Sequence, residues 1–458
     1  MQRRDDVTIA YIGGGSRNWA WTLMTDLALE ESLSGCIRLF DINKEAAKIN
    51  ETIGNHLSQR DEATGKWEYR AVDTLKEALC GADFVIVSIL PGTFEEMRSD
   101  VHMPEEYGIY QSVGDTVGPG GFFRAMRTIP MFEEIGLAIK EYAPKAWVIN
   151  YTNPMTICVK TLYKVFPEIK VVGCCHEVFG TQKLLIKVLR EAGIAQDVER
   201  EEIITNVVGI NHFTWFTQAT YQNMDLLPIY DAFADKYLES GYIDEENKGW
   251  ESDTFKFCER VKLDLFKRYG AIAAAGDRHL AEFMPEGYLD DPDTVHQWKY
   301  SLTTVDWRVN DMKQKVERSK RLAAFEEEID LKSSGEEGVA IMKALLGMDK
   351  LVTNVNFENK GQISNLPLDA VVESNAVISY DSVRPVFAGE VPEGVVSYMM
   401  EHVDMQEQIV DIVLAKDKAR ALKLFMQLPM LKKLTEEEKS ELFTKMFEGT
   451  KNYLKGWE

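Results

Sequence analysis

The chain of 458 residues is 45% hydrophobic and 28% charged, a composition typical of a globular protein with room for two or three domains. Its 52 basic and 74 acidic residues give a net charge of −22, which excludes the basic surface of a nucleic-acid-binding protein. No segment has the roughly 20 apolar residues that a membrane span needs, and the polar start predicts no signal peptide. We therefore expect a cytoplasmic protein, whose six cysteines are reduced thiols rather than a disulfide framework.

The first 200 residues alternate short apolar runs with helical patterns. A helix is predicted at about 19–33, and strands are predicted at 7–12, 36–42, 82–89, 146–150 and 169–173. Strands that alternate with helices favour a parallel sheet with right-handed crossovers. We predict an α/β fold in which residues 1–200 form a Rossmann-like, NAD-binding domain.

The pattern changes after residue 200. A longer extended passage is expected at 203–216, mostly helical sequence up to residue 320, and extended sequence again at 354–378. From about residue 392 the chain is helical and charged, and no Gly/Ser linker interrupts it. Residues 201–458 are therefore predicted as an α+β domain, packed against the first, for substrate, metal and oligomerisation.

A glycine loop closes the first predicted strand. Gly13, Gly15 and Ser16 stand where a backbone can approach a pyrophosphate at the start of a helix. Asp41 ends the second strand, where a carboxylate accepts hydrogen bonds from an adenine ribose and favours NAD over NADP. The match to G-x-G-x-x-G is incomplete, because Asn18 takes the third glycine position. A turn that serves only the chain geometry is the alternative.

Other candidate residues follow strands or glycines. Cys175 comes after one predicted strand and His212 after another, and a thiolate with an imidazole makes half of a metal site. On spacing alone, however, an isolated Cys or His is more often a core residue. Asp115 lies in the glycine-dense loop 114–121, and residues 276–279, Gly-Asp-Arg-His, group three ionisable side chains.

Together these segments resemble glycoside hydrolase family 4, the NAD- and metal-dependent glycosidases. The resemblance runs over most of the chain, in six segments in the same order: IGGGS at 12–16, GDTVGPGG at 114–121, INYTNP at 149–154, CHEV at 175–178, GINHFTW at 209–215 and GQISNLP at 361–367. It implies a small-molecule glycoside substrate, a homodimer or homotetramer, and a catalytic domain fused to the Rossmann-like sheet as in lactate and malate dehydrogenases.

The resemblance also implies roles for single residues. Cys175 and His212 would hold the metal, Mn²⁺ or another divalent cation, while Cys174 is structural. His176 stands at the proton donor's position, and Asp277 at that of the base in some α-specific members, where others use a tyrosine. The remaining roles are sugar contacts for Asp115 and Asn153, a nicotinamide contact for Asn150, and substrate binding for Arg98.

The substrate class follows from the segment at the metal cysteine. CHEV is similar to the α-galacturonidase version, and a uronic acid suits Arg98 and Arg278, because a carboxylate binds a guanidinium in a bidentate manner. An α-glucuronidase and an α-glucosidase are alternatives within the family. An NAD-dependent 2-hydroxy-acid dehydrogenase and a non-catalytic NAD or sugar sensor are alternatives outside it.

Overall fold

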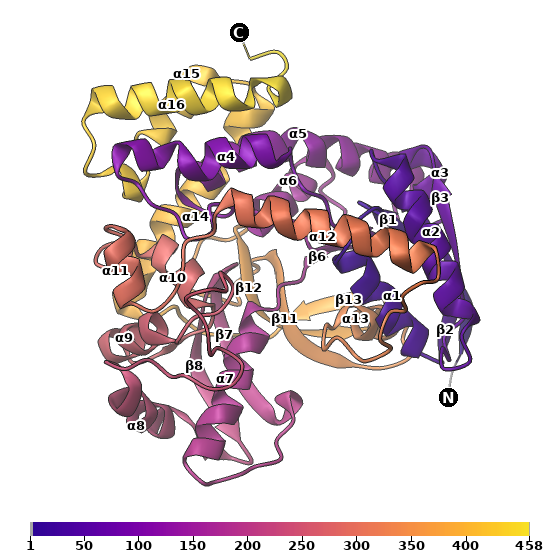
Figure 1. The fold of residues 1–458 in the computed structure, drawn as a ribbon, viewed down its shortest axis with the longest axis horizontal. Coiled ribbons are helices and arrows are strands. Elements are labelled where there is room, and N and C mark those ends of the chain that lie inside the picture. The colour runs from indigo at the N-terminus through magenta and orange to yellow at the C-terminus, as the bar shows by residue number, and fades with distance from the viewer. Residues whose placement is uncertain (1–2, 458) are drawn as a thin grey trace.

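The computed structural model describes residues 3–457, and within them a sheet of nine strands runs through the molecule (Figure 1). Its order is β13-β12-β11-β6-β5-β4-β1-β2-β3. The strands are β1 (Arg4–Ile12), β2 (Leu33–Phe40), β3 (Trp67–Val72), β4 (Phe84–Val87), β5 (Trp147–Asn150), β6 (Lys170–Gly173), β11 (Leu351–Glu358), β12 (Val371–Ser379) and β13 (Ser382–Pro385).

Strands β1 to β6 are parallel, and their order is that of a dinucleotide-binding sheet. All four residues of β4 are buried, as expected for a parallel strand that helices cover on both faces. The connecting helices are α1 (Trp19–Leu29), α2 (Lys44–Gln59), α3 (Leu75–Leu79), α4 (Phe94–His102), α5 (Gly118–Tyr142), α6 (Met155–Val165) and α7 (Glu177–Glu191). The predicted Rossmann-like parallel sheet is confirmed.

A second, antiparallel sheet carries β10 (Ile272–Ala273), β8 (Phe213–Tyr221) and β7 (Ile203–Ile210), and β9 (Met224–Asp225) pairs with β8. The passage expected at 203–216 is thus a hairpin that turns at His212. The helices around it are α8 (Leu227–Tyr237), α9 (Arg260–Tyr269), α10 (Asp277–Phe283) and α11 (Pro292–Gln297).

The remaining α-helices come from the second half of the chain. They are α12 (Val305–Ala323), α13 (Gly338–Leu345), α14 (Glu393–Leu414), α15 (Lys418–Phe425) and α16 (Glu436–Thr450). Helix α12 crosses the front of the molecule from α10 toward α2, and α14 to α16 gather beside α4 and α5 (Figure 1). Among the helices of residues 3–457, none is long and apolar enough to cross a membrane.

The structure corrects two details of the expected elements. Helix α1 ends at Leu29 rather than near residue 33, because Leu33 already begins β2. Strands β11 to β13 come from beyond residue 350 and extend the first sheet antiparallel to β6. A C-terminal segment therefore completes an N-terminal sheet, and the boundary at residue 200 stays a prediction.

Candidate active site

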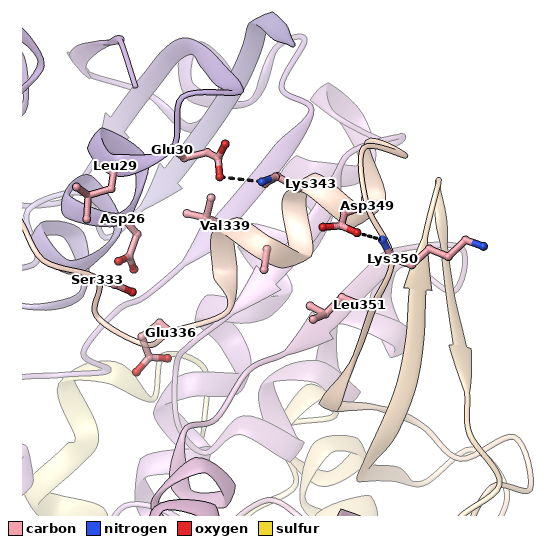
Figure 2. A pocket seen from close by; sticks show the side chains of 11 residues that line it. Asp26, Leu29, Glu30, Ser333, Glu336, Val339, Lys343, Asp349, Lys350 and Leu351 are labelled. Atoms are coloured by element: carbon pink, nitrogen blue, oxygen red, sulfur yellow. Dashed lines mark hydrogen bonds and ion pairs between the residues drawn. The ribbon is translucent and has the colours of Figure 1, made fainter. Parts of the chain in front are cut away.

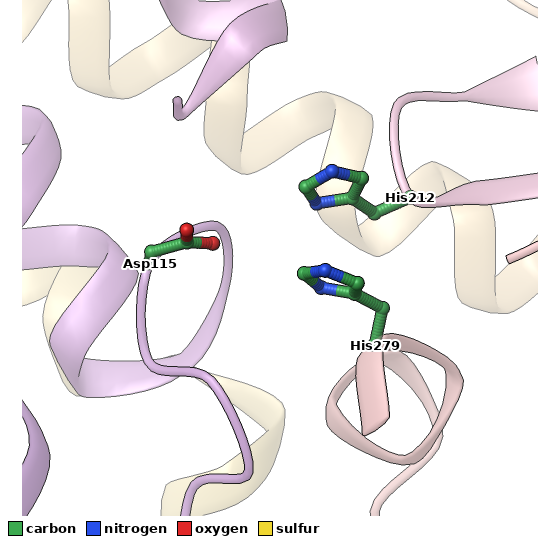
Figure 3. A group of neighbouring side chains, drawn as sticks. All are labelled: Asp115, His212 and His279. Carbon is green, nitrogen blue, oxygen red and sulfur yellow. The ribbon is translucent and has the colours of Figure 1, made fainter. Parts of the chain in front are cut away.

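Three side chains from distant parts of the chain meet in one cluster: Asp115, His212 and His279 (Figure 3). One potential ligand atom of each lies within 4.8 Å of those of the other two. The imidazole rings of His212 and His279 stack with their centroids 3.8 Å apart, and Asp115 points toward them from its loop. A carboxylate and two imidazoles at this spacing are a donor set suited to a divalent metal ion.

The loop that carries Asp115 depends on glycine. A Cβ on Gly121 would lie 2.4 Å from the carbonyl carbon of Thr116, so only glycine lets the loop fold back onto the first turn of α5. On its other side, Oε1 of Glu282 accepts hydrogen bonds from the backbone N–H groups of Val113 and Gly114, at 2.7 and 2.8 Å. These contacts fix the position of Asp115.

Thr116 links two members of the cluster. Its hydroxyl donates to Oδ1 of Asp115 at 2.7 Å and lies 2.9 Å from Nδ1 of His212. Since a hydroxyl has one proton, Nδ1 of His212 must donate to Thr116, which leaves Nε2 of His212 with a free lone pair. His212 is held in the β7–β8 turn at a φ of 63°, a strained value for a residue other than glycine.

Glu177, at the start of α7, reaches the same site from the first sheet. Its Oε2 accepts a hydrogen bond from the N–H of Gly276 at 2.6 Å, and its Oε1 lies 3.8 Å from Nε2 of His279. Gly276 directly precedes α10, which carries His279. The carboxylate therefore connects the carboxyl end of β6 to the helix that supplies one of the two histidines.

The charges of this site favour a cation. Burial lowers the pKa of His212 to about 3 and lowers that of His279, so both imidazoles are neutral near pH 7. Burial alone would raise the pKa of Asp115 and of Glu177. The Arg124 guanidinium outweighs burial at Asp115 and holds its pKa well below the usual range, and the hydrogen bond from the Gly276 N–H helps to keep Glu177 ionised. Two carboxylates and two neutral imidazoles are what a divalent cation requires.

The predicted nucleotide loop lies at the carboxyl end of β1. Gly13 has a φ of 92°, and a Cβ there would lie 2.0 Å from the carbonyl oxygen of Ser88. The Asp41 carboxylate accepts from the backbone N–H of Gly15 at 2.9 Å and from that of Asn43 at 2.8 Å. The Asn50 amide donates to the carbonyl of Gly14 at 2.8 Å and to that of Ser16 at 2.9 Å. The loop is thus tied to β2 and α2.

Cys175 and His176 follow β6, as the sequence suggests. Cys175 is half-buried, and burial together with the charge of Glu373 raises the pKa of its thiol. It is not one of the three residues in the Asp115 cluster. The His176 ring stacks on Trp19, with centroids 5.6 Å apart, and its Nδ1 lies 3.2 Å from Oε1 of Glu336, which raises the pKa of His176.

Three other candidate residues, Asn150, Arg98 and Asn153, differ in whether their side chains already bind other residues of the protein. The Asn150 amide closes a turn with the backbone of Thr152, at 3.0 Å in both directions. Arg98 forms an exposed ion pair with Asp306 on α12, at 2.8 Å. Asn153 differs, because its Oδ1 is buried without a hydrogen-bond partner among the described residues and remains available to a ligand.

The two charged residues that precede His279 in the Gly-Asp-Arg-His segment also form hydrogen bonds within the protein. The fully buried Asp277 carboxylate accepts from the backbone N–H of Val261 at 3.3 Å and of Lys262 at 3.0 Å, at the start of α9. Burial and the charge of Glu259 raise the pKa of Asp277 to about 7. Arg278 donates to the carbonyl of Ser112 and to Thr303, while its Nε is buried without a partner among residues 3–457.

Sequence reasoning assigned no role to His279, Glu177 or Asn50. The first two stand inside segments that it did select, next to the residues that it favoured, so the segments were found but not the side chains that face the site. Asn50 lies in the middle of α2, and no local signal distinguishes it from an ordinary helix residue.

A separate cavity of about 290 Å³ lies between α1 and α13 (Figure 2). Asp26, Glu30 and Ser333 line it, and an ion pair of 2.9 Å between Glu30 and Lys343 closes one side. Glu336, the partner of His176, lines it as well. No residue of the Asp115 cluster borders this cavity, so it is distinct from the candidate metal site.

Family comparisons assign both halves of the chain. The family model described as "Family 4 glycosyl hydrolase" matches residues 8–191, and the model described as "Family 4 glycosyl hydrolase C-terminal domain" matches residues 207–431. An α-galacturonidase of Thermoanaerobacterium saccharolyticum is 57% identical over 99% of this chain and 97% of its own length. An α-galacturonidase of Bacillus subtilis is 50% identical over 97% of both chains, whereas an α-galactosidase of the same organism is 27% identical.

Solved structures agree with this assignment. A Bacillus subtilis protein described as a glucosidase matches with a TM-score of 0.92 at 50% identity, over 97% of this chain and all of that one. A 6-phospho-α-glucosidase from gut microorganisms, solved with NAD and Mn²⁺, shares the fold with a TM-score of 0.81 at 21% identity, over 98% of this chain and 99% of that one.

Proposed function

Because the chain belongs to glycoside hydrolase family 4, we propose that it hydrolyses α-linked galacturonides with the help of NAD and a divalent metal ion. The observation that carries the substrate class is the gap in identity between relatives. Among the relatives compared by sequence, those at 50–57% are named α-galacturonidases, and those named for neutral sugars stand at 28% or below. The Bacillus subtilis structure that is described as a glucosidase has the same 50% identity as the α-galacturonidase of that organism. An α-glucuronide or an α-glucoside is the alternative substrate.

The described residues fit a metal ion. We propose Cys175 and His212 as its protein ligands; Asp115 and His279, which cluster with His212, are further candidate ligands. Nε2 of His212 has a free lone pair, and Thr116 holds the ring by its other nitrogen, as neighbouring groups do in many metal sites. Mn²⁺ is the proposed metal, and another divalent cation is the alternative.

The nucleotide loop fits NAD. We propose that Gly13, Gly15 and Ser16 lie along the pyrophosphate and that Asp41 accepts from the ribose hydroxyls. The backbone contact between Asp41 and Gly15 supports this, because it already holds the carboxylate at the loop. Asn150 near the nicotinamide stays a prediction, since its amide is used within the Asn150–Thr152 turn.

When bound, NAD would supply a reversible oxidation at C3 of the sugar, and the metal ion, held by Cys175 and His212, would supply Lewis acidity. The protein's own residues would then move the protons. We propose that His176 protonates the departing glycosidic oxygen, assisted by Asp115. The raised pKa of His176, caused by its bond with Glu336, supports a proton donor near neutral pH.

Asp277 is the proposed base at C2. A pKa of about 7 supports this role, because it makes the carboxylate a proton acceptor at the working pH. The Asp277 carboxylate accepts hydrogen bonds from two backbone N–H groups at the start of α9. To act as the base, it must therefore break these hydrogen bonds and turn toward the sugar. Asn153, Arg98 and Arg278 complete the proposed substrate contacts.

An assay of nitrophenyl α-galacturonide, α-glucuronide and α-glucoside with NAD⁺ and Mn²⁺ tests this function. We expect hydrolysis of the galacturonide without net formation of NADH, since the cofactor is restored in each turnover. Activity on the neutral glucoside alone would refute the uronic acid substrate. Steady accumulation of NADH would indicate a dehydrogenase instead.

We further infer a cytoplasmic enzyme that works as a homodimer or homotetramer. The six cysteines are all free, which supports a reducing compartment. Light scattering coupled to gel filtration determines the number of subunits, and a monomer at micromolar concentration would refute the oligomer.

A further inference from the structure

Three arginine side chains lie close enough to the Asp115 carboxylate to interact with its charge. They are Arg124 on α5, Arg278 on α10 and Arg308 on α12; burial lowers the pKa of each guanidinium, and the negative charge of Asp115 partly opposes this effect. The Asp115 cluster therefore suits a metal cation, and the positive charge of the three nearby arginines suits an anion.

Two of these three guanidinium groups already have partners in the protein. Nε of Arg124 donates to the carbonyl of Asn153 at 3.1 Å, and Arg278 donates to Ser112 and Thr303. Arg308 has no hydrogen bond or ion pair from its side chain to any residue in the part of the chain that the structure describes. A guanidinium carries five N–H donors, so Arg308 has its full capacity available.

Aromatic packing holds Arg308 in place. The Phe255 ring lies close to two guanidinium groups, with its centroid 5.7 Å from Cζ of Arg308 and 5.4 Å from Cζ of Arg278. The Trp307 ring packs edge-on against Phe255 at 5.1 Å. Such cation–π contacts orient a guanidinium without using its N–H donors.

The first turn of α12 is fixed as well. Asp306 pairs with Arg98 on α4, and the backbone N–H of Val305 donates to Nε2 of His102 at 3.2 Å. Arg98, selected from the sequence as a substrate ligand, thus braces the helix that presents Arg308. This bracing lowers the entropy lost when the guanidinium binds an anion.

We propose that Arg308 determines specificity by binding the C6 carboxylate of the sugar, with Phe255 holding its guanidinium toward the site. This inference rests on the proposed function, because it assumes a uronic acid substrate. It assigns to Arg308 the bidentate contact that the sequence suggests for Arg98 and Arg278, and Arg278 contributes its unpartnered Nε.

Calorimetric titration of D-galacturonate, with NAD⁺ and Mn²⁺ present, tests the inference without depending on turnover. We expect Arg308→Gln to weaken galacturonate binding about 10- to 100-fold, the effect of losing a charge-assisted hydrogen-bonded pair. The matched control is Arg321→Gln, since Arg321 lies on the same helix about 20 Å away and pairs with Glu327. It should bind like the wild type.

Circular dichroism checks that the variants fold. If Arg308→Gln does not fold, Arg308→Lys is decisive: it keeps the charge but loses the planar fork, and we expect several-fold weaker binding. If the folded Arg308→Gln variant binds galacturonate as tightly as the wild type, the inference is overturned. The same holds for Arg308→Lys if only that variant folds.

The outcome for the proposed function is separate. A wild-type protein that hydrolyses galacturonides while Arg308→Gln binds galacturonate equally well leaves the function standing and removes Arg308 from it. A wild-type protein that binds galacturonate through Arg308 but hydrolyses no galacturonide upholds this inference and refutes the function. A wild-type protein that binds no galacturonate overturns the inference.

Discussion

Glu177 and Gly276 lie 99 residues apart, yet the Glu177 carboxylate accepts a hydrogen bond from the Gly276 backbone N–H at 2.6 Å. Through this contact, the segment after β6 sets the start of α10 and so the position of His279. The contact also places a second carboxylate beside His279.

Replacing Glu177 should therefore weaken metal binding. We expect Glu177→Ala to reduce Mn²⁺ affinity about 10- to 100-fold, as loss of a residue that orients a metal ligand typically does. Titration followed by electron paramagnetic resonance measures the free Mn²⁺. Glu191→Ala is the control, because Glu191 lies at the far end of the same helix and pairs with Lys236. Equal affinity in both variants would argue against a role for Glu177.

Cys175 provides a direct test of the proposed metal ligands. Cys175→Ser should abolish hydrolysis and lower Mn²⁺ affinity, because a neutral hydroxyl replaces a thiolate that the metal would bind. The control is Cys80→Ser, which changes an exposed cysteine. Normal activity of Cys175→Ser at low Mn²⁺ would leave the ion to Asp115, His212 and His279.

Gly13 tests the nucleotide loop. Gly13→Ala should lose NAD binding, measured by quenching of tryptophan fluorescence, because the new Cβ would meet the Ser88 carbonyl at 2.0 Å. Gly81→Ala is a matched control: Gly81 also has a positive φ, 72°, but nothing lies within 4 Å of the point that its new methyl group would occupy. It should lose only about 1 kcal/mol of stability. Wild-type NAD affinity in Gly13→Ala would refute the loop's role.

Asp277 tests the assignment of the base. Incubation in D₂O should place deuterium at C2 of the product with the wild-type enzyme, and Asp277→Asn should lose this exchange while keeping its NAD affinity. His279→Gln is the informative comparison. Exchange that persists in Asp277→Asn and disappears in His279→Gln would move the role of base to His279.

The buried His402 predicts a pH dependence of stability. Burial lowers its pKa from 6.5 to about 4, so the folded protein disfavours the protonated ring. Its contribution is present above pH 6.5 and is lost as the pH falls toward 4, by about 3 kcal/mol in all. His402→Gln should therefore show a shallower fall of unfolding free energy between these pH values, measured with urea, than the exposed-site control His296→Gln. Parallel curves for the two would contradict this.

The sequence predicted the parts of the molecule that local patterns encode. Apolar runs marked β1, β2, β4, β5 and β6, since a strand buried on both faces is apolar along its length. Strand β3, Trp67–Val72, was missed, because polar and apolar residues mix in its six positions. The pairing of β11 with β6 was also missed, because a contact between segments so far apart leaves no local signal.

For the candidate site, too, the sequence indicates some residues and not others. Motif resemblance located Asp115, His212 and the Gly-Asp-Arg-His segment, since these stand in characteristic contexts. It did not reveal that Asp277 faces α9 while His279 faces His212, because the direction of a side chain on a helix follows from packing that the sequence does not state. Arg308 carries no motif and is found only through its position beside Phe255.

The antiparallel strands β11 to β13 have a consequence for the history of the chain. They cover the edge of β6 that a free-standing N-terminal half would expose, and an uncovered edge invites pairing with other chains. The two halves are therefore unsuited to exchange with unrelated partners by recombination near residue 200. The nucleotide loop and the histidines of the candidate metal site should be inherited together, as one unit, wherever this protein is found.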